Sequence, residues 1–280
     1  MDYELIEVTP LAGALGAEVS GVDMARPLGN RLFQEVRDAL LENQVIFFRG
    51  QDVTPAQHVA FARQFGTLQV HPLVPHLDDH PEVLVLESHE GKRTGANAWH
   101  SDVTFSDAPP LGSVLLAREV PDRGGDTIWA DMYAAYEALS PAMKRYLEGM
   151  TAVHQAGGAQ FEKTFETGDA RGGDVKESKR AIAPAEHPIV RTHPETGRKA
   201  LFVNSIFTQR IRGVARKESR AVLDYLFDHI ATPEFTCRFH WEKHSVAFWD
   251  NRCTQHYAIS DYGGARRLMH RVTIDGDTPY

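Results

Sequence analysis

Fourteen histidines are spread along the chain, and five of them are followed two residues later by an acidic residue. Residues two apart on a β-strand point to the same face, so a His-x-Asp or His-x-Glu pair can offer two ligands to one metal ion. Two histidines and one carboxylate on one face of Fe(II) leave three coordination positions open for a chelating cosubstrate and O₂. The five pairs are His76/Asp78, His80/Glu82, His100/Asp102, His193/Glu195 and His240/Glu242.

The local sequence favours His100/Asp102 as the metal pair. Its neighbours Trp99, Val103 and Phe105 would give a metal ion an apolar surround that keeps water out. The surroundings of the other pairs are less suitable. Pro and Asp residues nearby indicate solvated turns at His76, His80 and His193. The pair His240/Glu242 is typical of the exposed face of a strand.

A second group of polar residues lies near the C-terminal end of the chain. His256 comes 154 residues after Asp102 (256 − 102), Arg267 follows eleven residues later, and Arg271 four residues after that. On a strand, positions 267 and 271 share a face, so both guanidinium groups can point into one cavity. A planar guanidinium binds a carboxylate through two parallel hydrogen bonds. Either arginine could therefore bind an anion in that cavity.

The composition describes the kind of protein that carries these residues. The 280 residues are 42% hydrophobic and 24% charged, as in ordinary globular proteins, and we expect one domain, residues 1–280. The net charge of −8 and the lack of a basic stripe argue against nucleic acid as a partner. The chain has no apolar run of about 18 residues, so we expect no membrane segment. The two cysteines, Cys237 and Cys253, and the absence of a signal peptide predict a cytoplasmic protein.

Apolar periodicity predicts many short strands with a few helices between them. Asn30 precedes a helical pattern and is expected to cap it, and Thr54-Pro55 should begin a second helix. Expected strands are 45–48, 83–86, 114–117, 127–129, 235–241, 245–249, 254–257 and 268–274, and expected helices are 33–41, 55–65, 132–139, 141–147 and 215–231. This pattern predicts a β-sandwich or jelly roll with flanking helices. Residues 156–186, rich in Gly, Lys, Glu and Asp, are interpreted as a lid loop.

Four ordered motifs resemble the taurine dioxygenase (TauD/TfdA) family of Fe(II)- and 2-oxoglutarate-dependent dioxygenases. They are Trp-His-x-Asp-x-Thr-Phe at 99–105, Gly-Gly-Asp-Thr at 124–127, Trp-Asp-Asn-Arg-x-Thr-Gln-His at 249–256 and Arg-Arg-x-Met-His-Arg at 266–271. The resemblance covers nearly the whole chain. It implies a double-stranded β-helix (jelly roll) of the clavaminate synthase-like type, with Fe(II) as cofactor and 2-oxoglutarate and O₂ as cosubstrates.

The same resemblance assigns roles to individual residues. It implies that His100, Asp102 and His256 hold the iron. It also implies that Thr127 and Arg267 bind the C5 carboxylate of 2-oxoglutarate.

For the substrate, the resemblance implies that Arg271 and His71 bind its acidic group and that Phe207 forms a wall of the pocket. The chain departs from the taurine-specific pattern at Val74, where that pattern has Tyr, and at Ala96, where it has a polar residue; Asn97 next door can substitute. An amine buried without a partner is costly, so these departures favour a substrate less polar than taurine.

The expected reaction is hydroxylation of the carbon beside an anionic group, with 2-oxoglutarate converted to succinate and CO₂. A taurine-like alkylsulfonate, which would yield an aldehyde and sulfite, is the first expectation. An aryloxyalkanoate or an alkyl sulfate is the alternative within the same chemistry, and a non-catalytic jelly-roll metal-binding module is the alternative of a different class. The family also implies a homo-oligomer.

Overall fold

A computed structural model describes residues 3–71, 75–90, 97–156 and 183–280 of the chain. The described residues do not include Val74 and Ala96, the two departures from the taurine-specific pattern. They also leave out most of the expected lid loop. Among the described residues, no helix is both long and apolar enough to cross a bilayer.

The largest sheet formed by the described residues has nine strands. Its strands pair antiparallel except for β2 and β3, which run parallel. In spatial order they are β1 (Glu7–Pro10), β2 (Ala17–Ser20), β3 (Val45–Phe48), β15 (Val246–Asp250), β7 (Gly112–Glu119), β17 (Arg267–Ile274), β6 (His80–Ser88) and β5 (His76–Leu77), with β4 (Leu68–Gln69) also paired to β17.

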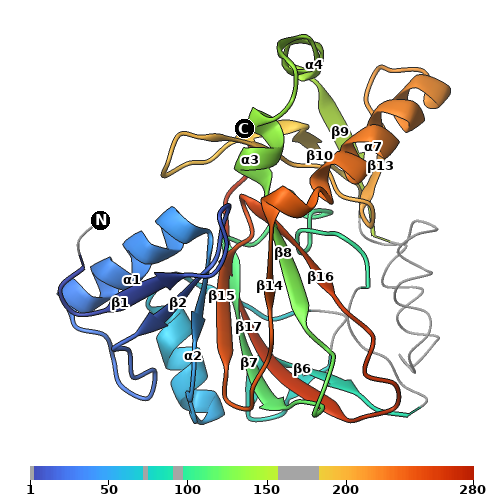
Figure 1. The fold of residues 1–280 in the computed structure, drawn as a ribbon. Helices are drawn as coiled ribbons and strands as arrows, with labels where there is room; N and C mark the ends of the chain where they lie inside the picture. The colour runs from blue at the N-terminus through green and yellow to red at the C-terminus, as the bar shows by residue number, and fades with distance from the viewer. Residues whose placement is uncertain (1–2, 72–74, 91–96, 157–182) are drawn as a thin grey trace.

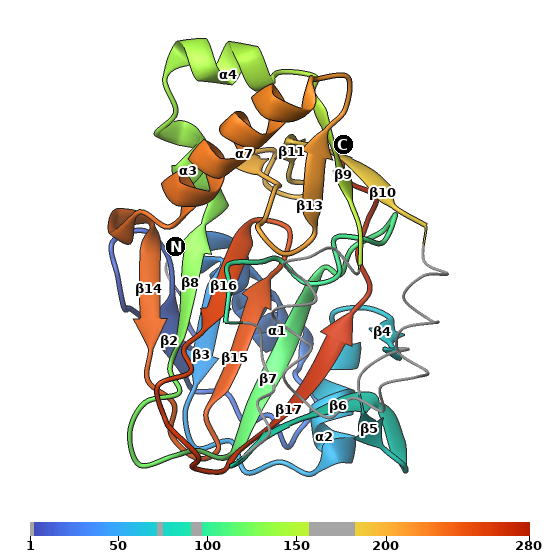
Figure 2. The same cartoon turned by 90° about the vertical axis from the view of Figure 1, so that its right-hand side faces the viewer.

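A smaller sheet of three antiparallel strands packs against the inner face of the large sheet (Figures 1 and 2). Its order is β14 (Thr236–Phe239), β8 (Thr127–Asp131) and β16 (Thr254–Ala258). The two sheets together form the predicted jelly roll, and the layer between them is made of aromatic and aliphatic side chains. Phe47 of β3 stacks on Phe239 of β14 with ring centroids 4.0 Å apart, and Trp129 of β8 lies 5.9 Å from Trp249 of β15.

Two helices cover the outer face of the large sheet (Figure 1). They are α1 (Asn30–Asn43) and α2 (Pro55–Arg63). Strand β3 is buried on both faces: Val45 and Phe47 face the layer between the sheets, and Ile46 and Phe48 face the helices. A continuous apolar run is therefore what this strand requires.

A third group of elements lies at one end of the sheets (Figure 2). It contains a three-stranded sheet, a two-stranded sheet and further helices around a separate apolar cluster. The strands are β10 (Ala185–Pro188), β9 (Thr151–His154) and β13 (Thr208–Ile211), then β11 (Val190–Thr192) and β12 (Lys199–Leu201); the helices are α3 (Met132–Glu137), α4 (Pro141–Leu147), α7 (Arg216–Ile230) and the 3₁₀ turn Pro233–Phe235.

Helix α2 begins as predicted, but α1 does not. Thr54 caps α2, and its hydroxyl accepts a hydrogen bond from the N–H of Gln57. The predicted cap Asn30 is instead the first helical residue of α1, and Gly29 occupies the cap position without a side-chain bond. The expected lid also has a wrong boundary, because Ala185 and Glu186 belong to strand β10.

Candidate functional site

The three predicted metal ligands come together in one buried cluster. Atoms of His100, Asp102 and His256 that can bind a metal all lie within 4.8 Å of one another. The three residues are at most 8% exposed. Nε2 of His100 is 3.7 Å from Oδ1 of Asp102.

Backbone pairing brings the two histidines together. His256 lies on β16, and His100 forms an isolated antiparallel bridge with it. The N–H of His100 donates to the carbonyl of His256 at 3.1 Å, and the reciprocal bond measures 2.8 Å. Their ring centroids are therefore only 4.1 Å apart.

Asp102 reaches the cluster by a different route from the one predicted. Strand alternation was expected to place His100 and Asp102 on one face, but Asp102 lies in a turn that follows the single bridge residue. This expectation was wrong. The turn, rather than a pleated strand, directs the carboxylate toward the imidazoles.

The cluster fits a metal ion, as judged from its own polar atoms. Oδ2 of Asp102 and Nδ1 of His256 are buried, and neither has a hydrogen-bond partner among the described residues. Buried polar atoms are normally paired, so such atoms call for a ligand. Nδ1 of His100 lies 2.9 Å from the carbonyl of Ala98, which leaves Nε2 facing the carboxylate. A second bond of this kind is typical of metal-binding histidines.

The protonation states also suit a metal ion. Burial lowers the pKa of His100, and it lowers the pKa of His256 to about 3. Burial alone would raise the pKa of Asp102, but Arg271 and the two imidazoles lower it to about 2. At neutral pH the cluster therefore holds two neutral imidazoles and one carboxylate, which are the forms that bind metal.

Arg271 and His71 share the surroundings of this cluster. Nη1 of Arg271 donates to Oδ1 of Asp102 at 3.0 Å. Burial and, to a lesser extent, the charge of Arg271 lower the pKa of His71 to about 4, and the charge of Asp102 opposes this shift. His71 therefore lies close enough to Arg271 and Asp102 for their charges to shift its pKa.

Thr127 and Arg267 both lie against Trp241. The indole N–H of Trp241 donates to the hydroxyl of Thr127 at 3.0 Å, and the Arg267 guanidinium carbon is 6.0 Å from the centre of the indole ring. Arg267 is only 6% exposed, and its Nε has no partner among the described residues. The pair thus has the hydrogen-bond capacity to hold a carboxylate.

Trp241 itself was missed in the sequence. A buried Trp needs a partner for its indole N–H, which was the available signal. Its partner, however, lies 114 residues away.

An apolar wall stands beside the imidazole of His100. The ring of Phe207 lies 6.4 Å from that of His100 and 5.2 Å from that of Phe105. Phe207 is 4% exposed. The wall is one buried cluster of Ala98, Val103, Phe105, Ala156, Ile206 and Phe207.

Asn97 occupies a different position from the other predicted substrate residues. It is exposed and borders a hollow of about 290 Å³, together with Trp99, Phe227 and Tyr257. His100, Asp102 and His256 do not line this hollow.

A second group with metal-like spacing, His193, Asp250 and Cys253, has its carboxylate already engaged. Arg252 binds both oxygens of Asp250, and Nε2 of His193 lies 3.0 Å from Oδ2. This cluster is therefore a buried ionic network. His193 is 1% exposed, so its interpretation as a solvated turn was wrong.

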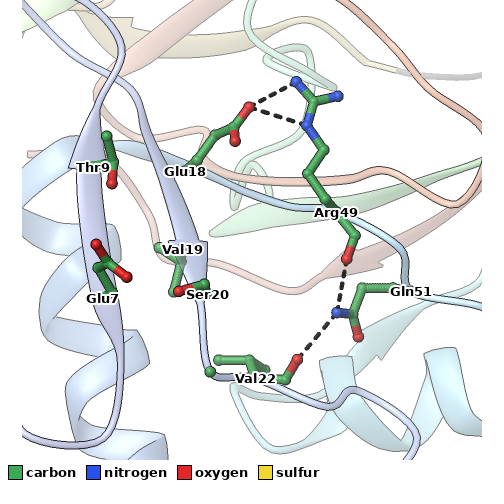
Figure 3. Close-up of a pocket in the computed structure, with 9 residues that line it drawn as sticks. Glu7, Thr9, Glu18, Val19, Ser20, Val22, Arg49 and Gln51 are labelled. Carbon is green, nitrogen blue, oxygen red and sulfur yellow. Dashed lines mark hydrogen bonds and ion pairs between the residues drawn. The ribbon is translucent and has the colours of Figure 1, made fainter.

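Another hollow, of about 380 Å³, borders strands β1 and β2 (Figure 3). Two of its charged groups pair with each other, since Arg49 binds Glu18 at 2.7 Å. In addition, Gln51 donates to the carbonyl of Val22 at 3.0 Å. None of its lining residues belongs to the cluster around His100.

Comparison with known proteins assigns the chain to a family. The model of the family described as "Taurine catabolism dioxygenase TauD, TfdA family" matches residues 7–273. An alkylsulfatase of Acinetobacter baylyi is 36% identical, with 97% of this chain and 86% of the relative covered. An alpha-ketoglutarate-dependent sulfate ester dioxygenase of Pseudomonas putida is also 36% identical, with 98% and 91% covered.

A solved structure agrees with these matches. The crystal structure of a taurine dioxygenase from Burkholderia xenovorans superposes with a TM-score of 0.84 at 39% identity, covering 99% of this chain and 91% of that one. The chain therefore belongs to the TauD/TfdA family, and it is a 2-oxoglutarate-dependent dioxygenase that uses Fe(II) together with 2-oxoglutarate and O₂.

Proposed function

We propose that this dioxygenase hydroxylates the carbon beside the sulfur oxyanion of an alkylsulfonate or an alkyl sulfate. His100, Asp102 and His256 hold the iron, and Thr127 and Arg267 hold the C5 carboxylate of 2-oxoglutarate. A sulfonate would collapse after hydroxylation to an aldehyde and sulfite, and a sulfate ester to an aldehyde and sulfate.

The observation that carries this proposal is the position of Arg271 next to Asp102. Its guanidinium lies 3.0 Å from one carboxylate oxygen of Asp102. The charges of Arg271 and Asp102 both shift the pKa of His71, so His71 lies near them. An oxyanion bound by Arg271 and His71 would sit beside the iron ligands. The carbon that carries the oxyanion would then be the one nearest the reactive centre, which is the geometry that hydroxylation requires.

The rest of the substrate would meet the apolar wall of Phe105, Ile206 and Phe207. This surface suits an alkyl chain and offers no side-chain partner for an amine, so taurine itself should be a poorer substrate than an alkyl analogue. The names of the alkylsulfatase and the sulfate ester dioxygenase support a sulfur oxyanion as the head group.

Iron, when bound, supplies the oxidative chemistry that decarboxylates 2-oxoglutarate to succinate and CO₂ and inserts one oxygen atom into the C–H bond. The protein binds and orients the substrate and the cosubstrate. Arg271 and His71 fix the head group, Arg267 and Thr127 fix the cosubstrate, and the apolar wall keeps water away from the reacting carbon.

A substrate screen tests the proposal. The enzyme, loaded with Fe(II) and 2-oxoglutarate, is incubated with 1-butanesulfonate, butyl sulfate, taurine and an aryloxyacetate, and succinate, sulfite and sulfate are measured. We expect succinate with the two alkyl compounds, and the inorganic product shows which of them is preferred. Turnover of the aryloxyacetate alone would contradict the proposal. A cytoplasmic location and a homo-oligomeric state stay predictions.

A further inference from the structure

Asp102 lies in a turn with an unusual backbone conformation. Among the described residues other than glycine, three have a positive φ angle, and Val103 (φ 54°) is the β-branched one. In this left-handed region the Cβ branches crowd the backbone, so a β-branched residue there is a genuine outlier. Such a conformation persists only where the surroundings hold it.

One side chain holds both backbone groups of Asp102. Oδ1 of Asn251 accepts a hydrogen bond from the N–H of Asp102 at 2.7 Å, and its Nδ2 donates to the carbonyl of Asp102 at 3.0 Å. The same Nδ2 also lies 3.3 Å from the carbonyl of Pro110. Asn251 is completely buried, so both its amide oxygen and its amide nitrogen form these hydrogen bonds within the core.

Asn251 is itself firmly placed. It directly follows strand β15, and its N–H donates to the carbonyl of Leu111 at 2.8 Å. The residue before it, Asp250, is fixed by Arg252 and His193. The asparagine can therefore act as a rigid support for a turn that lies 149 residues away in the sequence.

We infer that Asn251 is a positioning residue for the metal ligand Asp102, which it holds in place by keeping the following residue, Val103, in the left-handed conformation. Held in this way, the turn points the carboxylate at the imidazoles of His100 and His256. The apolar packing of Val103 against the wall that contains Phe207 helps to offset the strain. The inference rests on the metal site of the proposed function.

Mn(II) affinity, measured by electron paramagnetic resonance of the free ion, tests this without any turnover. Asn251→Ala should weaken Mn(II) binding by roughly 10–100-fold, as is common when the support of a metal ligand is lost. In that background, Val103→Gly should restore much of the affinity, because glycine adopts the left-handed conformation without strain. Val103→Ala is the matched control, since it also removes the branched side chain but keeps a Cβ, and it should restore much less.

An unchanged affinity in Asn251→Ala, or equal recovery with glycine and alanine at position 103, would overturn the inference. If Asn251→Ala does not fold, the melting temperatures of the single variants Val103→Gly and Val103→Ala test the strained turn on which the inference depends. The glycine variant should melt at the higher temperature, and the reverse order would refute a strained turn.

A wild-type chain that binds Mn(II) no better than His256→Ala would instead refute the metal site itself. Failure of the inference can therefore be told apart from failure of the proposed function.

Discussion

Arg267 and Arg271 lie four residues apart on β17, and each meets a different partner. Arg271 donates to the carboxylate of Asp102, whereas Arg267 lies over the ring of Trp241 beside Thr127. Met269 between them is buried in the same inter-sheet layer as Trp241, which confirms that the three alternate residues share the inner face. We therefore propose that the two guanidinium groups bind two different anions.

Replacing each arginine with alanine should show which of the two anions that arginine binds. Arg271→Ala should raise the KM for the substrate by at least about tenfold with little change for 2-oxoglutarate, because a lost charge-assisted bond costs about 1.5–3 kcal/mol. Arg267→Ala should show the opposite pattern. Steady-state kinetics with each compound varied in turn measures both constants, and Arg266→Ala, at an exposed position, is the control. An interchange of the two patterns would mean that the roles are reversed.

At the scale of elements, the sequence predicted the parts that local chemistry determines. Four apolar residues at 45–48 predicted a buried strand, and Thr54-Pro55 predicted the start of α2; both are confirmed. Asn30 was misplaced because Gly29 adopts the extended cap conformation just before it. The turn at Asp102 was not predictable, because its support, Asn251, comes from a distant strand end.

The short strands β9–β13 were also missed. They contain buried polar residues such as His154, His187 and Arg191, which break any clear alternation. Their polar groups are paired across the fold, for example Nε2 of His187 with the carbonyl of Thr104 at 2.9 Å. The stretch 99–105 was recognised from residue types in their local order, whereas the contacts that orient it come from tertiary structure.

The packing between the two sheets depends on Phe47. Its ring is fully buried and stacks on Phe239 of the opposite sheet. Phe47→Ala should therefore lower the free energy of unfolding by about 3–5 kcal/mol, since it leaves a cavity. Urea unfolding followed by tryptophan fluorescence measures this, with the exposed Tyr146→Ala as control, expected within about 0.5 kcal/mol. A cost below about 1 kcal/mol at Phe47 would contradict the packing described.

At the scale of the whole molecule, the site forms where the two sheets meet. The small sheet supplies His256 and Thr127, and the large sheet supplies Arg267 and Arg271. His100 and Asp102 lie between β6 and β7 in the sequence, and they are held by contacts with His256 and Asn251. The site is complete only when both sheets have packed.

Several buried histidines couple the stability of the whole molecule to pH. His58, on the buried face of α2, is fully buried, and burial lowers its pKa to about 3. The unfolded chain, with a histidine pKa near 6.5, then binds more protons than the folded one between about pH 6.5 and pH 3. The free energy of unfolding should therefore fall as the pH falls through this range.

His58→Gln should make this pH dependence shallower, by up to about 1.4 kcal/mol for each pH unit of the range. Denaturant unfolding at a series of pH values measures the slope, and His76→Gln, at an exposed position, is the control. An unchanged slope in His58→Gln would mean that this residue is not held neutral in the folded protein.

The most direct test of the metal site is an anaerobic titration of the Fe(II)-loaded protein with 2-oxoglutarate. Chelation of the iron by the cosubstrate should produce a visible metal-to-ligand charge-transfer band that saturates at one equivalent. Asp102→Ala should lack the band, and Asp107→Ala, at an exposed position on the same segment, should keep it. A folded wild-type protein without this band, or an Asp102→Ala variant that retains it, would contradict the assignment of His100, Asp102 and His256 as the iron ligands.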